Sequence, residues 1–125
     1  MKMSQRGLAG VIILDLEGRL ILGDGEQEFR DRVDELMKQG HMKILVNMNA
    51  VTYIDSAGVG AVVWKYITLV RKGGMMKLVN LKTRTHTVLS ITKLLTVLES
   101  FDTEMDAVLS FSNPSPPPSA RGSVL

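Results

Sequence analysis

The chain has 125 residues with 15 basic and 13 acidic side chains, a net charge of +2 and no cysteine. This length suits one domain with one core, and the lack of cysteine excludes a disulfide scaffold, a thiolate metal site and a thiol nucleophile. The basic residues are scattered and only 5% of residues are aromatic, so we expect no direct nucleic-acid binding. With no apolar run near the length of about 20 residues that crosses a bilayer and no signal peptide, we expect no membrane span and a cytoplasmic location.

The first part of the chain predicts apolar strand-like runs followed by a helix. Residues 8–16 are nearly all apolar, and a second short apolar run covers residues 20–22. After the break at residues 23–25, residues 26–39 carry acids in the first turn and an apolar face, which predicts a helix closed by Gly40. That apolar face consists of Phe29, Val33, Leu36 and Met37.

A second strand and helix occupy the middle of the chain. Residues 43–48 form a short, mostly apolar run that predicts a strand. Apolar residues spaced three and four apart then predict a helix that ends at the basic and glycine residues 72–74. The residues on this periodic face are Val59, Val62, Val63, Tyr66, Ile67 and Val70.

The last third predicts short elements and a tail. Residues 75–81 and 96–98 favour strands, and residues 83–91 favour a short helix. A last helix is expected to begin at Asp102 or Thr103, where residues 103–106 approximate a capping box, and to run to Ser110. We expect Met105, Val108 and Leu109 on its apolar face, Phe111 to close it against the sheet, and Met37, Met48 and Met76 to lie in the core with Met105.

Strands that alternate with helices favour an α/β domain, with right-handed crossovers between parallel strands and helices on at least one face of the sheet. From residue 113 the composition changes to four prolines with serine and glycine, which leave little to bury. We therefore expect a domain in residues 1–112 and a disordered Pro/Ser-rich tail in residues 113–125.

The most informative stretch is residues 51–61, where a strand gives way to a helix. It places Ser56 after an acid, Asp55, and before two glycines, Gly58 and Gly60. Near a helix N-cap, a serine hydroxyl can cap the helix, attack a substrate or accept a phosphate. The two glycines cost about 1 kcal/mol each relative to alanine, which indicates close approach by a neighbouring strand or by another protein.

Catalysis has little support in the residues. The only histidines, His41 and His86, have no evident orienting carboxylate, so no base for Ser56 is apparent. The glycines around Asp24 lack the phosphate-loop pattern, and no further carboxylates join Asp24 and Asp55 by spacing to hold magnesium. We expect no metal, cofactor or enzymatic activity, and we expect Asp55 to order the turn or to position Ser56.

Residues 53–60, with the preceding strand 44–48, resemble the signature of STAS domains, specifically the bacterial anti-sigma factor antagonists. The resemblance extends to residues 16–20, to the Gly-Gly turn and strand at 72–80 and to residues 91–101, so it covers about residues 8 to 111. It implies a single domain with a compact, mixed sheet of four or five strands and helices packed mainly on one face.

The resemblance also implies a function. In this family the serine after the aspartate is phosphorylated, which maps onto Ser56, and the unphosphorylated form binds an anti-sigma factor that is also a serine kinase. A serine phosphatase would reset the switch. The family often has a polar residue at the position that is Ile21 in this chain, and here an acid, Asp24, follows it instead. The expected partner contacts are Asp55, Ser56, Ala57, Gly58, Val59 and Asp24.

One further expectation concerns Gly58, and one alternative function stays open. If the partner approaches Gly58, a bulky side chain there should block binding while altering folding little. The alternative function is a non-switching STAS scaffold subunit of a signalling or lipid-transport complex.

Overall fold

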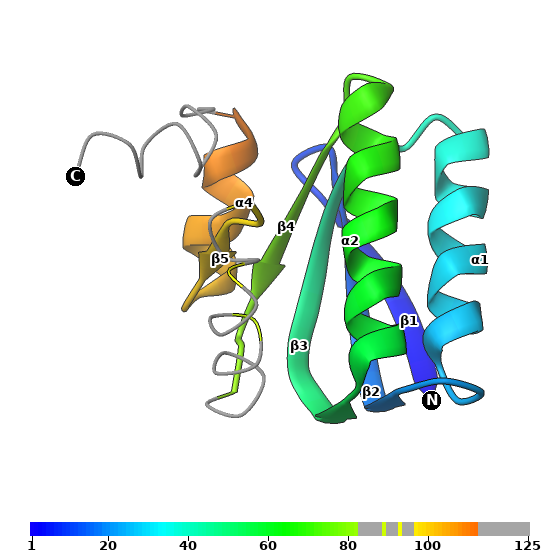
Figure 1. Cartoon of the computed structure of the whole chain (residues 1–125). Coiled ribbons are helices and arrows are strands. Elements are labelled where there is room, and N and C mark those ends of the chain that lie inside the picture. Colours follow the sequence, from blue (N-terminus) through cyan, green and yellow to red (C-terminus); the bar gives the residue numbers. More distant parts are fainter. Residues whose placement is uncertain (83–88, 90–92, 94–96, 113–125) are drawn as a thin grey trace.

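A computed structural model of the chain describes residues 1–82, 89, 93 and 97–112. The five-stranded sheet has the order β1-β2-β3-β4-β5, with β1 antiparallel to β2 and all other neighbours parallel (Figure 1). It is the mixed α/β sheet that the sequence predicted. The elements are β1 (Lys2–Leu8), β2 (Val11–Leu20), α1 (Glu26–Lys38), β3 (Lys43–Ile54), α2 (Ser56–Arg71), β4 (Met75–Val79), β5 (Ser100–Phe101) and α4 (Glu104–Ser112).

The N-terminal hairpin of β1 and β2 was not predicted. The chain reverses at Ala9 and Gly10, whose φ angles are 52° and 79°, as a two-residue turn between antiparallel strands requires. The apolar run 8–16 therefore contains a turn as well as a strand. The side chains of β1 are largely exposed, so this strand lacks the apolar alternation by which a half-buried strand is predicted.

The parallel strands bring the ends of β2 and β3 together. Leu20 at the end of β2 pairs with Ile54 at the end of β3. The central strand thus continues six residues beyond the predicted end at Met48, because Val51 and Ile54 are also buried. Helix α1 ends as predicted, with Gly40 at a φ of 87°, a conformation that glycine adopts without strain.

Helices cover both faces of the sheet. Helices α1 and α2 pack side by side on one face, and α4 lies on the other (Figure 1). Successive strand residues alternate between the two layers, so that Leu14 joins the α1–α2 core and Ile13 joins the α4 core. The prediction of helices mainly on one face is confirmed, with α4 as the helix on the opposite side.

Helix α4 is rotated relative to the prediction. Its N-terminus is capped as expected, since the backbone N–H of Asp106 donates to the Thr103 hydroxyl at 3.2 Å. Ala107, Val108 and Phe111 are buried, so Phe111 closes the helix against the sheet. Met105 and Leu109 are 73% and 60% exposed, and their predicted core positions are wrong because the small Ala107 faces the sheet.

The remaining short elements compare less closely with the prediction. Strand β5 is Ser100–Phe101, whereas residues 97–98, predicted as strand, form a turn and a bend. The predicted helix 83–91 falls almost wholly outside the described residues, as does the tail 113–125. Met48 and Met76 are buried as predicted, and Met37 is half-buried against the same core.

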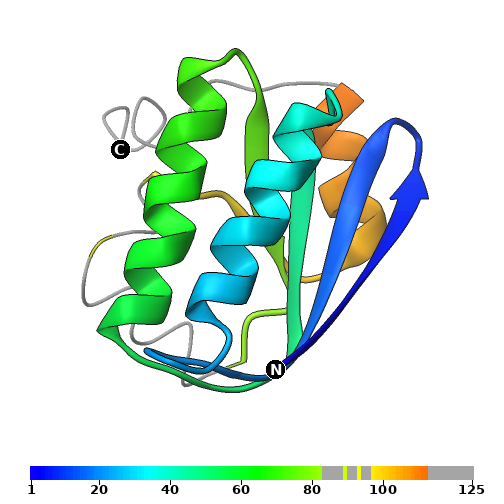
Figure 2. The ribbon, with the colours of Figure 1, turned by 90° about the vertical axis from the view of Figure 1, so that its right-hand side faces the viewer.

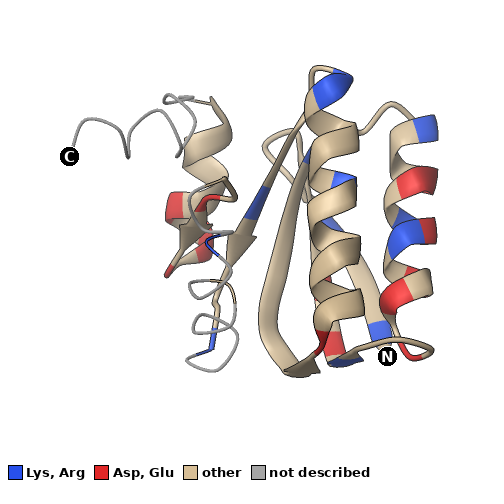
Figure 3. Cartoon of the chain, viewed as in Figure 1, with Lys and Arg blue, Asp and Glu red and all other residues tan. Residues whose placement is uncertain are grey.

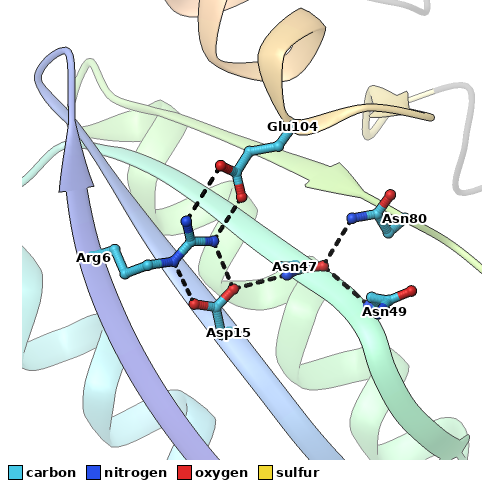
Figure 4. Close-up of polar contacts among 6 residues, drawn as sticks. All are labelled: Arg6, Asp15, Asn47, Asn49, Asn80 and Glu104. Atoms are coloured by element: carbon cyan, nitrogen blue, oxygen red, sulfur yellow. Dashed lines mark hydrogen bonds and ion pairs between the residues drawn. The ribbon is translucent and has the colours of Figure 1, made fainter.

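A polar network ties α4 to the sheet (Figure 4). The guanidinium of Arg6 on β1 donates to Asp15 on β2 at 2.7 Å and to Glu104 on α4 at 2.6 Å. Asn47 on β3 donates to the same Asp15 at 2.8 Å and accepts from Asn80 at 3.2 Å. The bonds from Arg6 hold the pKa of the Asp15 carboxyl below its usual range. Asp15, at the centre of this network, is therefore ionised at neutral pH.

Candidate functional site

The predicted site lies at the carboxyl-terminal ends of the neighbouring strands β2 and β3. The turn from β3 into α2 sits beside the loop that follows β2, and the backbone N–H of Asp55 faces the carbonyl oxygen of Leu20 at 3.4 Å. Ligand sites of open α/β sheets occur at this carboxyl end of the parallel strands. In Figure 1 this end of the sheet is at the bottom of the molecule, where α2 begins.

Asp55, rather than Ser56, caps helix α2. One carboxylate oxygen of Asp55 accepts from the backbone N–H of Gly58 at 2.9 Å, and the other accepts from the N–H of Leu22 at 3.0 Å. These bonds, first from Gly58 and then from Leu22, lower the pKa of Asp55, because they favour its ionised form. Asp55 therefore orders the turn, as expected, and also fastens it to the loop after β2.

Gly58 is buried against the neighbouring strand. A Cβ atom at this position would overlap the Leu20 carbonyl oxygen, with the carbonyl carbon at 2.9 Å and the Ile54 side chain at 3.0 Å. Of the two explanations for this glycine, the structure supports close approach of the strand. The prediction that a bulky residue here alters folding little is wrong, because the clashing atoms belong to the backbone.

Ser56 is the first residue of α2 and is exposed. Among the described residues, no side chain or backbone group hydrogen-bonds its hydroxyl. His41 precedes β3, whose twelve residues span on the order of 40 Å at the usual strand rise, so it cannot serve Ser56 as a base. His86 lies outside the described residues. The site presents a hydroxyl that is accessible for modification.

Asp24 holds the adjoining loop instead of projecting freely from it. Its carboxylate pairs with Arg19 at 2.9 Å and with the Met1 amine at 3.1 Å. These partners, the amine first, lower the pKa of Asp24. The backbone of Ile21 and Asp24 exchanges two further hydrogen bonds of 2.9 and 3.0 Å, which closes the loop into a tight turn.

The sequence analysis overlooked Leu22 as a surface residue. Its N–H is held by Asp55 while 72% of the residue is exposed, so an apolar side chain stands on the loop that Asp55 joins to the Ser56 turn. Tyr53, the penultimate residue of β3, is 46% exposed. The placement of Leu22 directly before the turn at residues 23–25 was the available signal for an exposed apolar residue.

The arrangement around Ser56 has no feature of a metal centre. Within residues 1–82, 89, 93 and 97–112, no three His, Asp or Glu side chains gather as metal ligands would. In the same part of the chain, no helix has the length and apolar character needed to span a membrane.

These observations define a small α/β domain with an exposed serine at the start of an aspartate-capped helix. The chain belongs to the STAS domain family, whose model matches residues 2–107. An anti-sigma F factor antagonist of Paenibacillus polymyxa is 25% identical over 100 residues, which are 79% of this chain and 85% of that protein.

Solved structures agree with this assignment. A candidate anti-sigma factor antagonist of Thermotoga maritima superimposes with a TM-score of 0.83 at 26% identity, covering 88% of this chain and 94% of that one. The Bacillus protein SpoIIAA in its phosphorylated form has the same fold, with a TM-score of 0.68 at 21% identity over 86% of this chain and 96% of that one. The STAS domain family inferred from the sequence is confirmed, and relatives named as anti-sigma factor antagonists are among the proteins that it resembles.

Proposed function

We propose that this protein is a phosphorylation-controlled binding switch that acts as an anti-sigma factor antagonist in the cytoplasm. With Ser56 unphosphorylated, it binds an anti-sigma factor that is also a serine kinase and so frees a sigma factor for transcription. Phosphorylation of Ser56 by that kinase weakens binding, and a serine phosphatase restores it. The domain in residues 1–112 carries this function, with residues 113–125 as a solvated tail.

The exposed Ser56 hydroxyl is the observation that carries the proposal. Asp55 already caps α2 through Gly58, so Ser56 is not required for the cap and is accessible to an enzyme. Relatives support the same assignment, because an anti-sigma F factor antagonist matches most of the chain. A protein of the same fold has been solved in both unphosphorylated and phosphorylated forms.

The partner surface consists of the exposed ends of the two loops around Ser56. Asp55, Ala57 and Val59 flank the serine, and Asp24 lies on the adjoining loop, with Gly58 beneath them as a packing residue. Leu22 adds an exposed apolar side chain to this surface, and burial of its apolar area against a partner would favour binding.

A phosphate on Ser56 changes this surface more than the fold. It adds about −1.5 to −2 charge at pH 7, at a helix start where the dipole and free N–H groups favour an anion. The same charge stands beside the ionised Asp55, which also binds the N–H of Leu22, so a docked partner would have to desolvate two neighbouring anions. A coupling free energy of about 3 kcal/mol would weaken binding roughly a hundredfold.

The test combines phosphate mapping with partner titration. The protein is incubated with the candidate anti-sigma factor kinase and ATP, and phosphate is mapped by mass spectrometry. Ser56→Ala should abolish incorporation and keep full affinity for the partner, whereas Ser56→Asp should bind at least tenfold more weakly. Ser4→Ala, at an exposed serine on β1, is the matched control and should behave as the wild type.

Two results would overturn the proposal. Stoichiometric phosphorylation of Ser56→Ala would place the modification elsewhere. A wild-type protein that binds its partners equally well before and after incubation with kinase, and that acquires no phosphate, would favour the non-switching STAS scaffold.

A further inference from the structure

Strand β1 presents an unpaired edge of the sheet. Within the described part of the chain it pairs with β2 alone, whereas the opposite edge strand, β5, has only two residues. Figure 2 shows β1 as the outermost strand of the sheet. Because alternate residues of an antiparallel strand direct their N–H and C=O groups away from the neighbouring strand, half of the backbone groups of β1 face outward.

The hairpin geometry identifies these residues. Leu8 and Val11 flank the two-residue turn and are paired, and the pair that closes such a turn exchanges both hydrogen bonds. Counting back along β1 from Leu8, the residues whose backbone groups face the open edge are Met3, Gln5 and Gly7. The edge therefore offers three N–H donors and three carbonyl acceptors to an added strand.

An acidic groove runs beside this edge. It has a volume of about 610 Å³ and is lined by Met1, by Met3 of β1 and by four residues of α1, here called its α1 wall. The wall residues are Glu28, Asp31, Arg32 and Glu35.

The wall has a net negative charge. Three of its four residues are acids, and Arg32 is engaged with Gln5 at 3.1 Å. Among the described residues, none of the three acids pairs with a Lys or Arg side chain, and all three are exposed. Figure 3 shows charged residues along α1 on the side of the molecule where β1 lies.

We propose that the β1 edge and this groove bind an extended, basic segment of a partner protein by strand addition. The backbone of the segment would pair with Met3, Gln5 and Gly7, which supplies affinity independent of sequence. Side chains of an added strand alternate between faces. Those on the α1 side would enter the groove, and Lys or Arg there would meet Glu28, Asp31 and Glu35.

The charges favour such a partner over a second copy of this chain. In a symmetric β1–β1 pairing, the second copy would bring its own acidic α1 wall toward the first. It would also present Met3 and Gln5 to the groove, while its cation Arg6 is held on the opposite face by Asp15 and Glu104. Like charges placed together oppose association, so the groove fits a basic segment from a different chain.

The experiment uses the full chain, labelled with ¹⁵N, and an acetylated seven-residue peptide of alternating lysine and valine. At saturating peptide we expect amide exchange of Met3, Gln5 and Gly7 to slow at least tenfold. A peptide of alternating glutamate and valine should bind at least tenfold more weakly. The paired change Asp31→Lys with Glu35→Lys should reduce affinity for the lysine peptide at least tenfold, whereas Asp106→Lys, on exposed α4, should alter it less than twofold.

Three results would overturn the proposal. The first is equal affinity for the two peptides, and the second is lysine-peptide binding that leaves the β1 amides unprotected. The third is protection of the same amides without peptide, together with dimer formation in sedimentation, since the second copy would then be the occupant. The two-peptide comparison on the wild-type chain remains decisive even where a charge-reversal variant fails to fold.

Discussion

Replacement of Gly58 by alanine should destabilise the fold, although alanine is the better helix former. The added Cβ would overlap the Leu20 carbonyl oxygen and lie 2.9 Å from its carbonyl carbon. Leu20 cannot rotate this group away as a flexible side chain could, because the group belongs to the backbone of β2. The start of α2 or the end of β2 must therefore shift.

The magnitude follows from two opposing effects. Overpacking in a closely packed region costs about 1–3 kcal/mol, and removal of a helical glycine gains about 1 kcal/mol. Because the overlapping atoms belong to the backbone, the cost should lie in the upper part of that range, at about 2–3 kcal/mol, which leaves a net loss of about 1–2 kcal/mol. For a domain of this size, about 4 °C of melting temperature corresponds to 1 kcal/mol, so circular dichroism melts should show a decrease of about 4–8 °C.

Gly60 provides a matched control on the same helix. Among the described residues, no heavy atom beyond the adjoining backbone of α2 lies within 4 Å of a Cβ at Gly60, so Gly60→Ala gains helix propensity without a clash. Its free energy of unfolding should rise by about 0.5–1 kcal/mol. If Gly58→Ala melted at or above the wild-type temperature, or if the two variants shifted alike, the packing argument would be refuted.

Asp55→Asn should melt at a lower temperature than the wild type at pH 7. Because folding lowers the pKa of Asp55, its ionised form stabilises the fold, and the difference in melting temperature should close as pH falls below the ordinary Asp pKa of 3.8. A difference that stays constant down to pH 2 would contradict this. Lys77→Met should lower the free energy of unfolding in urea by about 2 kcal/mol, because it removes the 2.9 Å hydrogen bond from the buried Nζ to the Ser110 hydroxyl. An unchanged urea midpoint would contradict this prediction. Ser56→Ala should stay within about 0.5 kcal/mol of the wild type by the same measurement, and a larger loss would mean that the hydroxyl is structural. Deletion of residues 113–125 should leave the melting temperature and Ser56 phosphorylation unchanged, and an unfolded product would refute the assignment of a tail.

The elements with strong periodicity were predictable from the sequence. Helix α1 was expected at residues 26–39 and spans Glu26–Lys38, because acids, an apolar face and a closing glycine all agree. Strand β1 was missed because an exposed edge strand has no buried face to impose alternation. Strand β5 was misplaced because two residues are too few to show any period.

The candidate site was only partly predictable. The stretch around Ser56 identified the turn, but Asp and Ser are comparable N-caps, so sequence could not decide which residue caps α2. Leu22 and Asp55 meet across 33 residues, and Leu20 and Gly58 across a strand crossover. Such contacts depend on the parallel register of β2 and β3, which no local pattern encodes.

Within the Asp55–Gly58 turn, two residues have structural roles and Ser56 is exposed. Asp55 and Gly58 build the turn, since one caps and fastens it and the other lets α2 approach Leu20. Ser56 lies between them without a structural duty among the described residues. Changes at Asp55 or Gly58 would therefore disturb the fold together with the proposed partner surface, and a lost interaction in such variants would not identify a contact. Only changes at Ser56, with the cap intact, separate the switch from the scaffold that holds it.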